Sequence, residues 1–150
     1  MTSDTTFLRQ FETAALPLEE WHHQQHLKVA YLYLRKHPFA EALALMRANI
    51  KAYNAAHHVP DTQLSGYHET MTQAWMRLVD FTLREYGPAE NADDFCQRHP
   101  ELSRKETMRL FYTRELFMSP EAKAGFIEPD LAPLPKGKAL AASQGGTVVQ

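Results

Sequence analysis

The chain has 150 residues, of which 44% are hydrophobic, 11% aromatic and 23% charged, with a formal net charge of -2. This length and composition predict one folded domain and exclude a disordered polyelectrolyte. The balanced charge argues against a nucleic-acid partner, and no apolar run approaches the length of a membrane span. The single cysteine excludes an internal disulfide, and the sequence begins without a secretory signal. We therefore expect a cytoplasmic protein.

Helical periodicity, with prolines at the segment borders, predicts an all-α fold. We expect a helical bundle of about four longer helices plus short helices and an extended C-terminal segment. Residues 1–135 should form a single helical domain, and residues 136–150, which are rich in small side chains, a mobile C-terminal tail. In chain order, the expected helices cover residues 7–16, 17–36, 39–56, 67–86, 93–98, 103–117 and 119–126, and the proline-rich segment 129–135 should be extended.

Eight histidines are the most distinctive feature of the composition. His23 and His26 lie about 60° apart on a helix and about one turn from each other. Both fall on the apolar face of the helix expected over residues 17–36. His22 and His26 form an alternative pair, but His22 lies nearer the border of that face. Ala30 follows one turn after His26, and its small side chain leaves space for a ligand.

A second cluster surrounds His68, which faces inward at the start of the helix expected over residues 67–86. The positive end of the helix dipole favours its neutral form, which can bind a metal or accept a proton. Glu69 is rotated about 100° away and could reach a shared site from the flank. Glu115 lies on an apolar helical face, where a carboxylate is costly unless it is paired or coordinated. Tyr67 could orient a substrate with its hydroxyl group.

These residue types favour a site for one divalent transition metal, which could be Zn, Fe, Ni or Cu. We expect a metal-dependent enzyme that acts on a small molecule, with His23, His26 and His68 as the ligands of a mononuclear site. Glu69 or Glu115 would be the fourth ligand or the general base. The reaction could be a hydrolysis, a lyase step or an oxygenation.

Two alternatives keep the fold but change the role of the histidines. The first is a non-catalytic metal-binding or sensing module with a closed set of ligands. The second is a helical interaction protein in which His23 and His26 make structural hydrogen bonds and do not converge with His68. A shared metal site requires imidazole nitrogens within about 4 Å of a common point. A homodimer is compatible with any of these.

Two motifs together carry a family resemblance. Residues 21–27 have the pattern W-x-H-x-x-H-L, and residues 66–70 read G-Y-H-E-T. With the flanking segments, the sequence resembles a family of small, all-helical bacterial proteins that is uncharacterised. The resemblance covers most of the chain, from Phe7 to Pro135, and implies histidines at positions 23, 26 and 68. It implies no activity.

Overall fold

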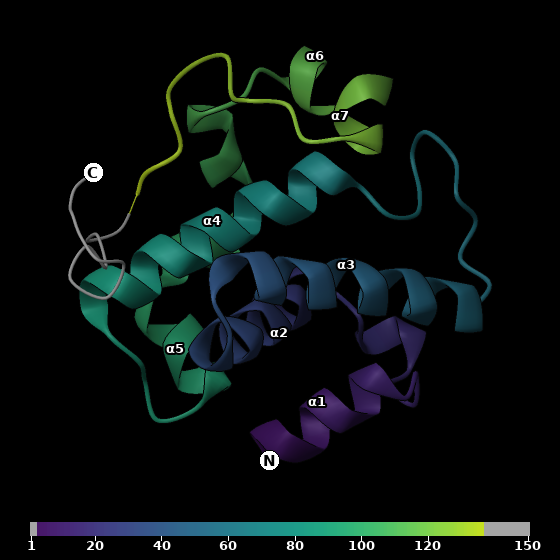
Figure 1. Cartoon of the computed structure of the whole chain (residues 1–150), viewed down its shortest axis with the longest axis vertical. Helices are drawn as coiled ribbons and strands as arrows, with labels where there is room; N and C mark the ends of the chain where they lie inside the picture. The colour runs from purple at the N-terminus through teal and green to yellow at the C-terminus, as the bar shows by residue number, and fades with distance from the viewer. Residues whose placement is uncertain (1–2, 137–150) are drawn as a thin grey trace.

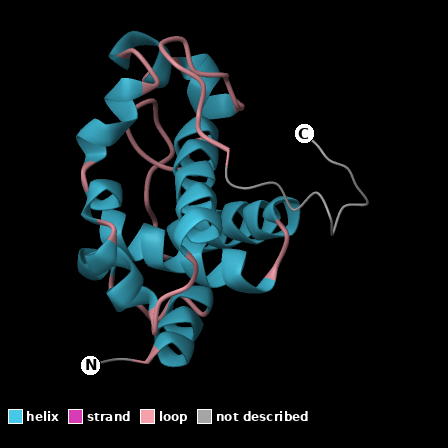
Figure 2. Ribbon diagram, turned by 90° about the vertical axis from the view of Figure 1, so that its left-hand side faces the viewer, coloured by secondary structure: helices cyan, strands magenta, loops and turns pink. Residues whose placement is uncertain are grey.

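A computed structural model describes residues 3–136, and within this range the chain forms helices joined by loops and no β-strand (Figures 1 and 2). The all-α expectation is therefore confirmed. The expected tail lies outside the described residues, apart from its first position. In chain order the elements are α1 (Asp4–Glu12), η1 (Leu18–Glu20), α2 (His23–Lys36), α3 (Phe39–Ala56), α4 (Glu69–Tyr86), α5 (Ala92–Arg98), η2 (Pro100–Ser103), η3 (Lys105–Leu110), α6 (Arg114–Phe117) and α7 (Pro120–Ala124), where η marks a 3-10 helix.

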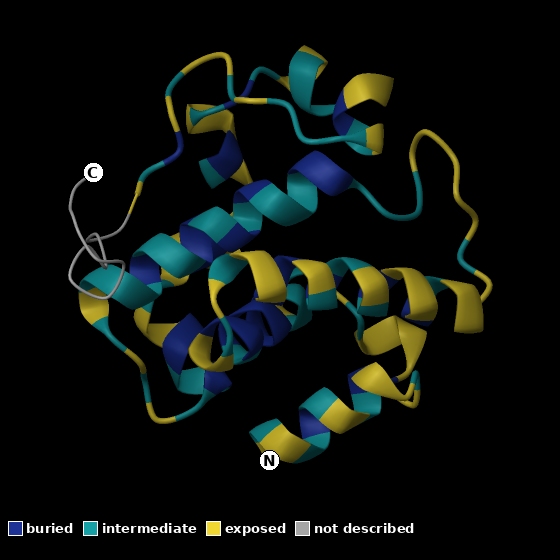
Figure 3. Ribbon diagram, viewed as in Figure 1, coloured by how far each residue is buried: buried dark blue, intermediate teal, exposed yellow. Residues whose placement is uncertain are grey.

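Helices α2, α3 and α4 form the centre of the fold, because each packs against the other two. Helix α1 packs on α2 and α3, and α5 packs on α2. The buried faces of these helices turn toward one another, while exposed residues lie outward (Figure 3). Tyr31, Tyr53 and Phe95 are at most 1% exposed. Burial of side chains of this size contributes about 1.5–3 kcal/mol each to folding. Within residues 3–136, no helix is long and apolar enough to cross a membrane.

The helix expected over residues 17–36 is interrupted near its start. Trp21 leaves the helical conformation after η1, and α2 begins only at His23. The Trp21 indole stacks on Phe11 of α1, with ring centroids 4.6 Å apart. The side chain of Gln25 accepts a hydrogen bond from the backbone N–H of His22 and so caps the new helix start. Contact with α1 therefore places Trp21 beside the first turn of α2.

The single helix expected over residues 103–117 is wrong, because this stretch divides into η2, η3 and α6. Asp130 accepts hydrogen bonds from the backbone N–H and the hydroxyl of Thr113. The backbone N–H of Leu131 donates to the carbonyl of Phe111. These partners lie far along the chain and compete with helical hydrogen bonds. As a result, Glu115 lies on α6, where it is exposed, and does not share a buried face with Met108.

The segment after α7 has no helix and packs along the bundle, as the yellow chain in Figure 1 shows. The hydroxyl of Thr70, in the first turn of α4, donates to the carbonyl of Gly125 and accepts from the N–H of Ile127. Tyr112 donates to the carbonyl of Ile127, and Leu134 is buried. The start of α4 is therefore attached to the C-terminal part of the fold.

The loop between α3 and α4 is a tight turn held by α7. Gly66 has φ +94°, and an added Cβ would lie 2.7 Å from Oδ1 and 2.9 Å from Cα of Asp61. Only glycine fits this position without strain. The ammonium group of Lys123 lies 2.7 Å from both Oδ1 of Asp61 and the carbonyl oxygen of Tyr67, and donates to each. These contacts fix the approach of the chain to α4.

Candidate functional site

A cavity of about 400 Å³ lies between α2, α3, α4 and the loop that precedes α4. This volume is within the usual range for small-molecule sites. Leu18, His22 and Lys105 are exposed members of its lining and mark its opening. No aspartate or glutamate lines it. The full lining is Leu18, Trp21, His22, His23, His26, Leu27, Ala30, Met46, Ile50, Asn54, Val59, Gly66, Tyr67, His68, Met71, Thr72, Trp75, Met76 and Lys105.

Among the imidazoles of this lining that are not exposed, His26 is the one without a hydrogen-bond partner among residues 3–136. Its ring stacks on Trp21 with centroids 3.9 Å apart, so one face is covered by the indole. Burial lowers its pKa to about 3, and the nearby His23 and Lys105 act in the same direction. His26 is therefore neutral near pH 7, with one nitrogen that can donate and one that can accept.

His23, at the first position of α2, is bonded to the protein through one nitrogen. Its Nε2 donates to the carbonyl oxygen of Leu102 at 2.8 Å, and its ring contacts Trp75 edge-on. Because a carbonyl only accepts, Nε2 carries the hydrogen and Nδ1 is unprotonated in the neutral ring. Burial lowers the pKa of His23, and the positive charge of Lys105 adds to this effect. The hydrogen bond between His23 and Leu102 fixes η2 against the start of α2.

His68 is the N-cap of α4, and both of its nitrogens are in use. Nδ1 accepts a hydrogen bond from the backbone N–H of Met71 at 3.0 Å, and Nε2 donates to the carbonyl of Phe117 at 2.9 Å. An imidazole bonded in this way has no lone pair left for a metal ion. Burial lowers its pKa, so the neutral ring that these two bonds require is favoured.

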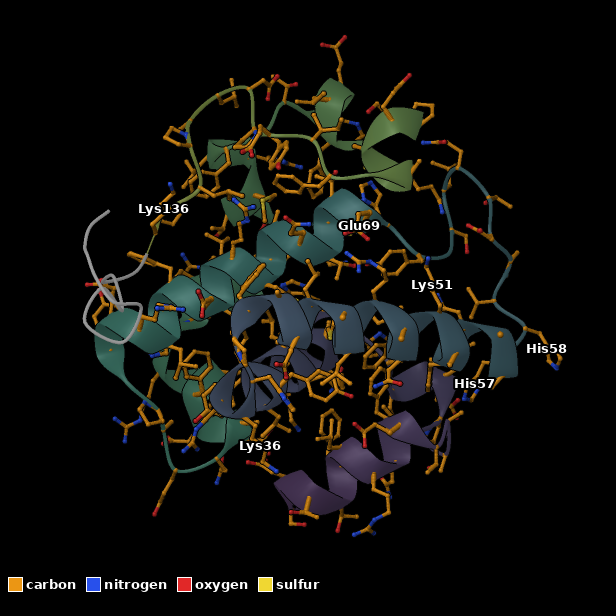
Figure 4. The ribbon with its side chains drawn as sticks, in the orientation of Figure 1. Lys36, Lys51, His57, His58, Glu69 and Lys136 are labelled. Atoms are coloured by element: carbon orange, nitrogen blue, oxygen red, sulfur yellow. The ribbon has the colours of Figure 1, made fainter. Side chains whose placement is uncertain are left out.

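Glu69 lies at the start of α4 (Figure 4) and forms a two-point ion pair with Arg47 of α3, at 2.9 and 2.7 Å. The hydroxyl of Tyr67 donates to the same carboxylate at 2.8 Å, and Gln73 adds a longer hydrogen bond. The Arg47 guanidinium holds the pKa of Glu69 below its usual value. Burial and the hydrogen bond to Glu69 raise the pKa of Tyr67. These groups form a structural network and leave Glu69 little capacity to act as a base.

The six residues singled out from the sequence therefore fall into separate places. His23, His26, His68 and Tyr67 line one cavity, whereas Glu69 pairs with Arg47 and is not part of the lining. Glu115 is exposed on α6 and lies outside the cavity. Among residues 3–136, no group of three or more His, Cys, Asp or Glu side chains is arranged to hold a metal ion. The expected three-histidine centre thus has no geometric support in this conformation.

Two parts of the site, Lys105 and the wall formed by helix α3, have no role in the sequence interpretation. The sequence predicts Lys105 on one long helix over residues 103–117, whereas the structure places it at the start of η3, in the cavity lining. Helix α3 contributes Met46, Ile50 and Asn54 to the wall, opposite α2. The apolar periodicity of α3 indicates a buried face. It does not show whether that face packs against other side chains or lines a cavity.

Comparisons of the chain with models of known protein families, with curated proteins and with solved structures found no match. The resemblance to an uncharacterised bacterial family stays a prediction.

Proposed function

We propose that this protein binds one small organic molecule in the cavity between α2, α3 and α4, and that His26 makes the hydrogen bond that orients this molecule. The observation that carries the proposal is the unbonded imidazole of His26 in a cavity of ligand size. Most buried polar groups have a hydrogen-bond partner. A ligand atom in the cavity would supply the partner that the protein does not.

The protonation state of His26 favours recognition over proton transfer. A general base works best when its pKa is near the working pH. Burial lowers the pKa of His26 to about 3, so the neutral ring takes up a proton only weakly near pH 7. The neutral ring can still donate one hydrogen bond and accept another. A ligand with a hydroxyl, amide or carboxyl group matches this capacity.

The remaining wall favours a ligand with an apolar or aromatic body. Trp21, just before α2, and Trp75, on α4, contribute two indole rings, and each already contacts a histidine ring. Met46, Met71 and Met76 add flexible thioether side chains, which adapt to irregular shapes and contact aromatic rings favourably. Apolar walls with a few polar groups are typical of small-molecule sites.

The proposal is tested by ligand-observed NMR with a set of single-ring and short-chain compounds, each carrying one neutral, anionic or cationic group. We expect saturable binding to the wild type and an affinity about tenfold lower for His26→Phe, which keeps a ring on Trp21 but loses the hydrogen bond. His37→Phe, the same substitution at the far end of α2, should bind like the wild type.

A second variant tests the cavity itself. Ala30 is buried and lines the cavity, so Ala30→Leu places additional side-chain volume inside it. We expect this variant to lose binding while its circular dichroism spectrum stays that of the wild type. The proposal is wrong if no compound in the set binds, or if Ala30→Leu binds as tightly as the wild type.

The metal-dependent enzyme expected from the sequence is the second candidate function. The observation in its favour is that three neutral imidazoles line one cavity. It requires His68 to give up its hydrogen bonds to Met71 and Phe117, so metal binding must be accompanied by movement at the start of α4. Calorimetric titration with Zn²⁺, Fe²⁺, Ni²⁺ and Cu²⁺ tests it. A single tight metal site that is lost in His68→Ala supports this candidate. If no such site is found, binding of an organic molecule remains the proposed function. The cytoplasmic location expected from the sequence remains part of either proposal.

A further inference from the structure

We propose that the ligand of the cavity is a small monocarboxylate with an apolar body, and that Lys105 at the opening binds its carboxylate. This inference rests on the proposed function and adds the chemical class of the ligand. It starts from the charges in the lining: Lys105 is present, and no aspartate, glutamate or arginine accompanies it. Lys105 therefore gives the cavity lining a positive charge in a chain whose formal net charge is -2.

The ammonium group of Lys105 has no carboxylate partner among residues 3–136. Among the lysines of the described chain, Lys28 pairs with Asp93 and Lys123 pairs with Asp61. Lys105 has no such pair within this part of the chain, like Lys36, Lys51 and Lys136, but of these unpaired lysines Lys105 alone lines the cavity. Glu106 follows Lys105 directly in the sequence but neither pairs with it nor lines the cavity. An anion at the opening would therefore meet a charge that the protein leaves uncompensated.

The backbone on either side of Lys105 is held by two hydrogen bonds, one of which comes from His23 of the site. His23 bonds the carbonyl of Leu102 and so holds η2 against α2. The hydroxyl of Thr107 donates to the carbonyl of Glu101 at 2.7 Å and closes the turn between η2 and η3. Lys105 lies between these two contacts in the chain and is part of the cavity lining. Its positive charge also acts to lower the pKa of both His23 and His26.

The composition of the site distinguishes between classes of anion. One lysine without arginine matches one negative charge, whereas phosphate groups are commonly held by a two-point arginine contact or by several cations. The indole and thioether walls exclude a ligand that is polar throughout. Low-dielectric walls also strengthen the attraction between a bound carboxylate and Lys105 compared with an open surface. An aryl-substituted or short aliphatic carboxylate meets these conditions.

The test uses three probes that share a phenylalkyl body and carry an anionic, a neutral or a cationic head group: 4-phenylbutyrate, its amide 4-phenylbutyramide and 4-phenylbutylamine. We expect the carboxylate to bind the full-length protein about fivefold more tightly than the amide, as an ion pair at a partly exposed lysine allows. The amine should bind more weakly than both. The preference should shrink as salt is raised, because the opening is accessible to ions.

Two charge-removing variants complete the experiment. Lys105→Gln should bind carboxylate and amide equally. Lys36→Gln removes the same charge at the exposed far end of α2 (Figure 4) and should keep the wild-type preference. If the amide binds the wild type as tightly as the carboxylate, or if Lys105→Gln keeps the preference, this inference is overturned while the proposed function stands. If none of the three probes nor any other compound of the set binds, the proposed function fails as well.

Discussion

The starts of α2 and α4 face the same cavity, and each carries histidine, yet they differ in how their polar groups are used. At the start of α4, both nitrogens of His68 and both carboxylate oxygens of Glu69 are bonded to the protein. At the start of α2, His26 is covered by Trp21 but bonded to nothing among residues 3–136. A histidine in a cavity wall can therefore bind a ligand only through a nitrogen that is not already bonded to the protein.

The largest change in the free energy of unfolding is expected from Glu69→Ala, at the start of α4. This substitution leaves Arg47 without its carboxylate and removes the acceptor of the Tyr67 hydroxyl. Since removing one partner of a partly buried charge network is strongly destabilising, we expect a loss of about 3 kcal/mol in the free energy of unfolding, measured in urea. Glu69→Gln, which keeps the shape and one acceptor, should lose less. A loss below about 0.5 kcal/mol for Glu69→Ala would mean that the network is only a surface contact.

The second-largest loss of stability is expected for His68→Ala, which removes the cap of α4 and the hydrogen bond to Phe117. Loss of an N-cap and one further hydrogen bond should cost about 2 kcal/mol in unfolding free energy. His68→Asn keeps a capping side chain and should recover about half of this loss. Equal stability of His68→Ala and the wild type would contradict the structural role assigned to this imidazole.

At the start of α2, the imidazole of His26 should make the stability of the protein depend on pH. Burial lowers the folded-state pKa of His26 from 6.5 to about 3. The unfolded chain therefore binds more protons below pH 6.5, and stability falls as the pH falls from 6.5 toward 3. We expect His26 to account for about 1.9 kcal/mol of the loss between pH 7 and pH 5.

The control for this effect is His26→Phe, which cannot titrate. Its unfolding free energy should decline less steeply than that of the wild type over the same pH range, although His23 and His68 still contribute a decline, because burial lowers their pKa values too. Below about pH 4.5, protonation of Glu69 should add a further loss in both proteins, since Arg47 lowers its pKa. Parallel curves for the two proteins between pH 7 and pH 5 would show that His26 is well solvated.

The smallest effect is expected in the loop that leads into α4. Asp61→Asn removes the ion pair with Lys123, in which the Asp61 side chain is 80% exposed. Exposed ion pairs contribute little, so the change in unfolding free energy should be about 0.5 kcal/mol or less. A larger loss, measured in the same urea titration, would mean that the turn at Gly66 depends on this contact.

The parts of the fold that depend on local sequence could be predicted, and those that depend on distant contacts could not. Helix α3 has the expected bounds, because its apolar periodicity and the preceding proline are local signals. The break of residues 103–117 depends on Asp130, and the position of Trp21 depends on Phe11. Neither partner can be recognised from the neighbouring residues.

The same distinction applies to the site. Helical geometry indicated that His23, His26 and His68 face the interior, and all three line the cavity. Whether a ring nitrogen of an imidazole is available to a ligand depends on which backbone carbonyl lies beside it. The carbonyls in question belong to Leu102 and Phe117, whose positions follow from the packing of short 3-10 and α-helical turns. Spacing along one helix carries no information about them.

The placement of the tryptophans has a practical consequence. The chain contains two, Trp21 and Trp75, and both form the wall of the cavity. The ultraviolet emission of an indole responds to the polarity of its surroundings and to groups stacked on it. The tryptophan fluorescence of the unlabelled protein should therefore respond to changes inside the cavity, without background from tryptophan elsewhere.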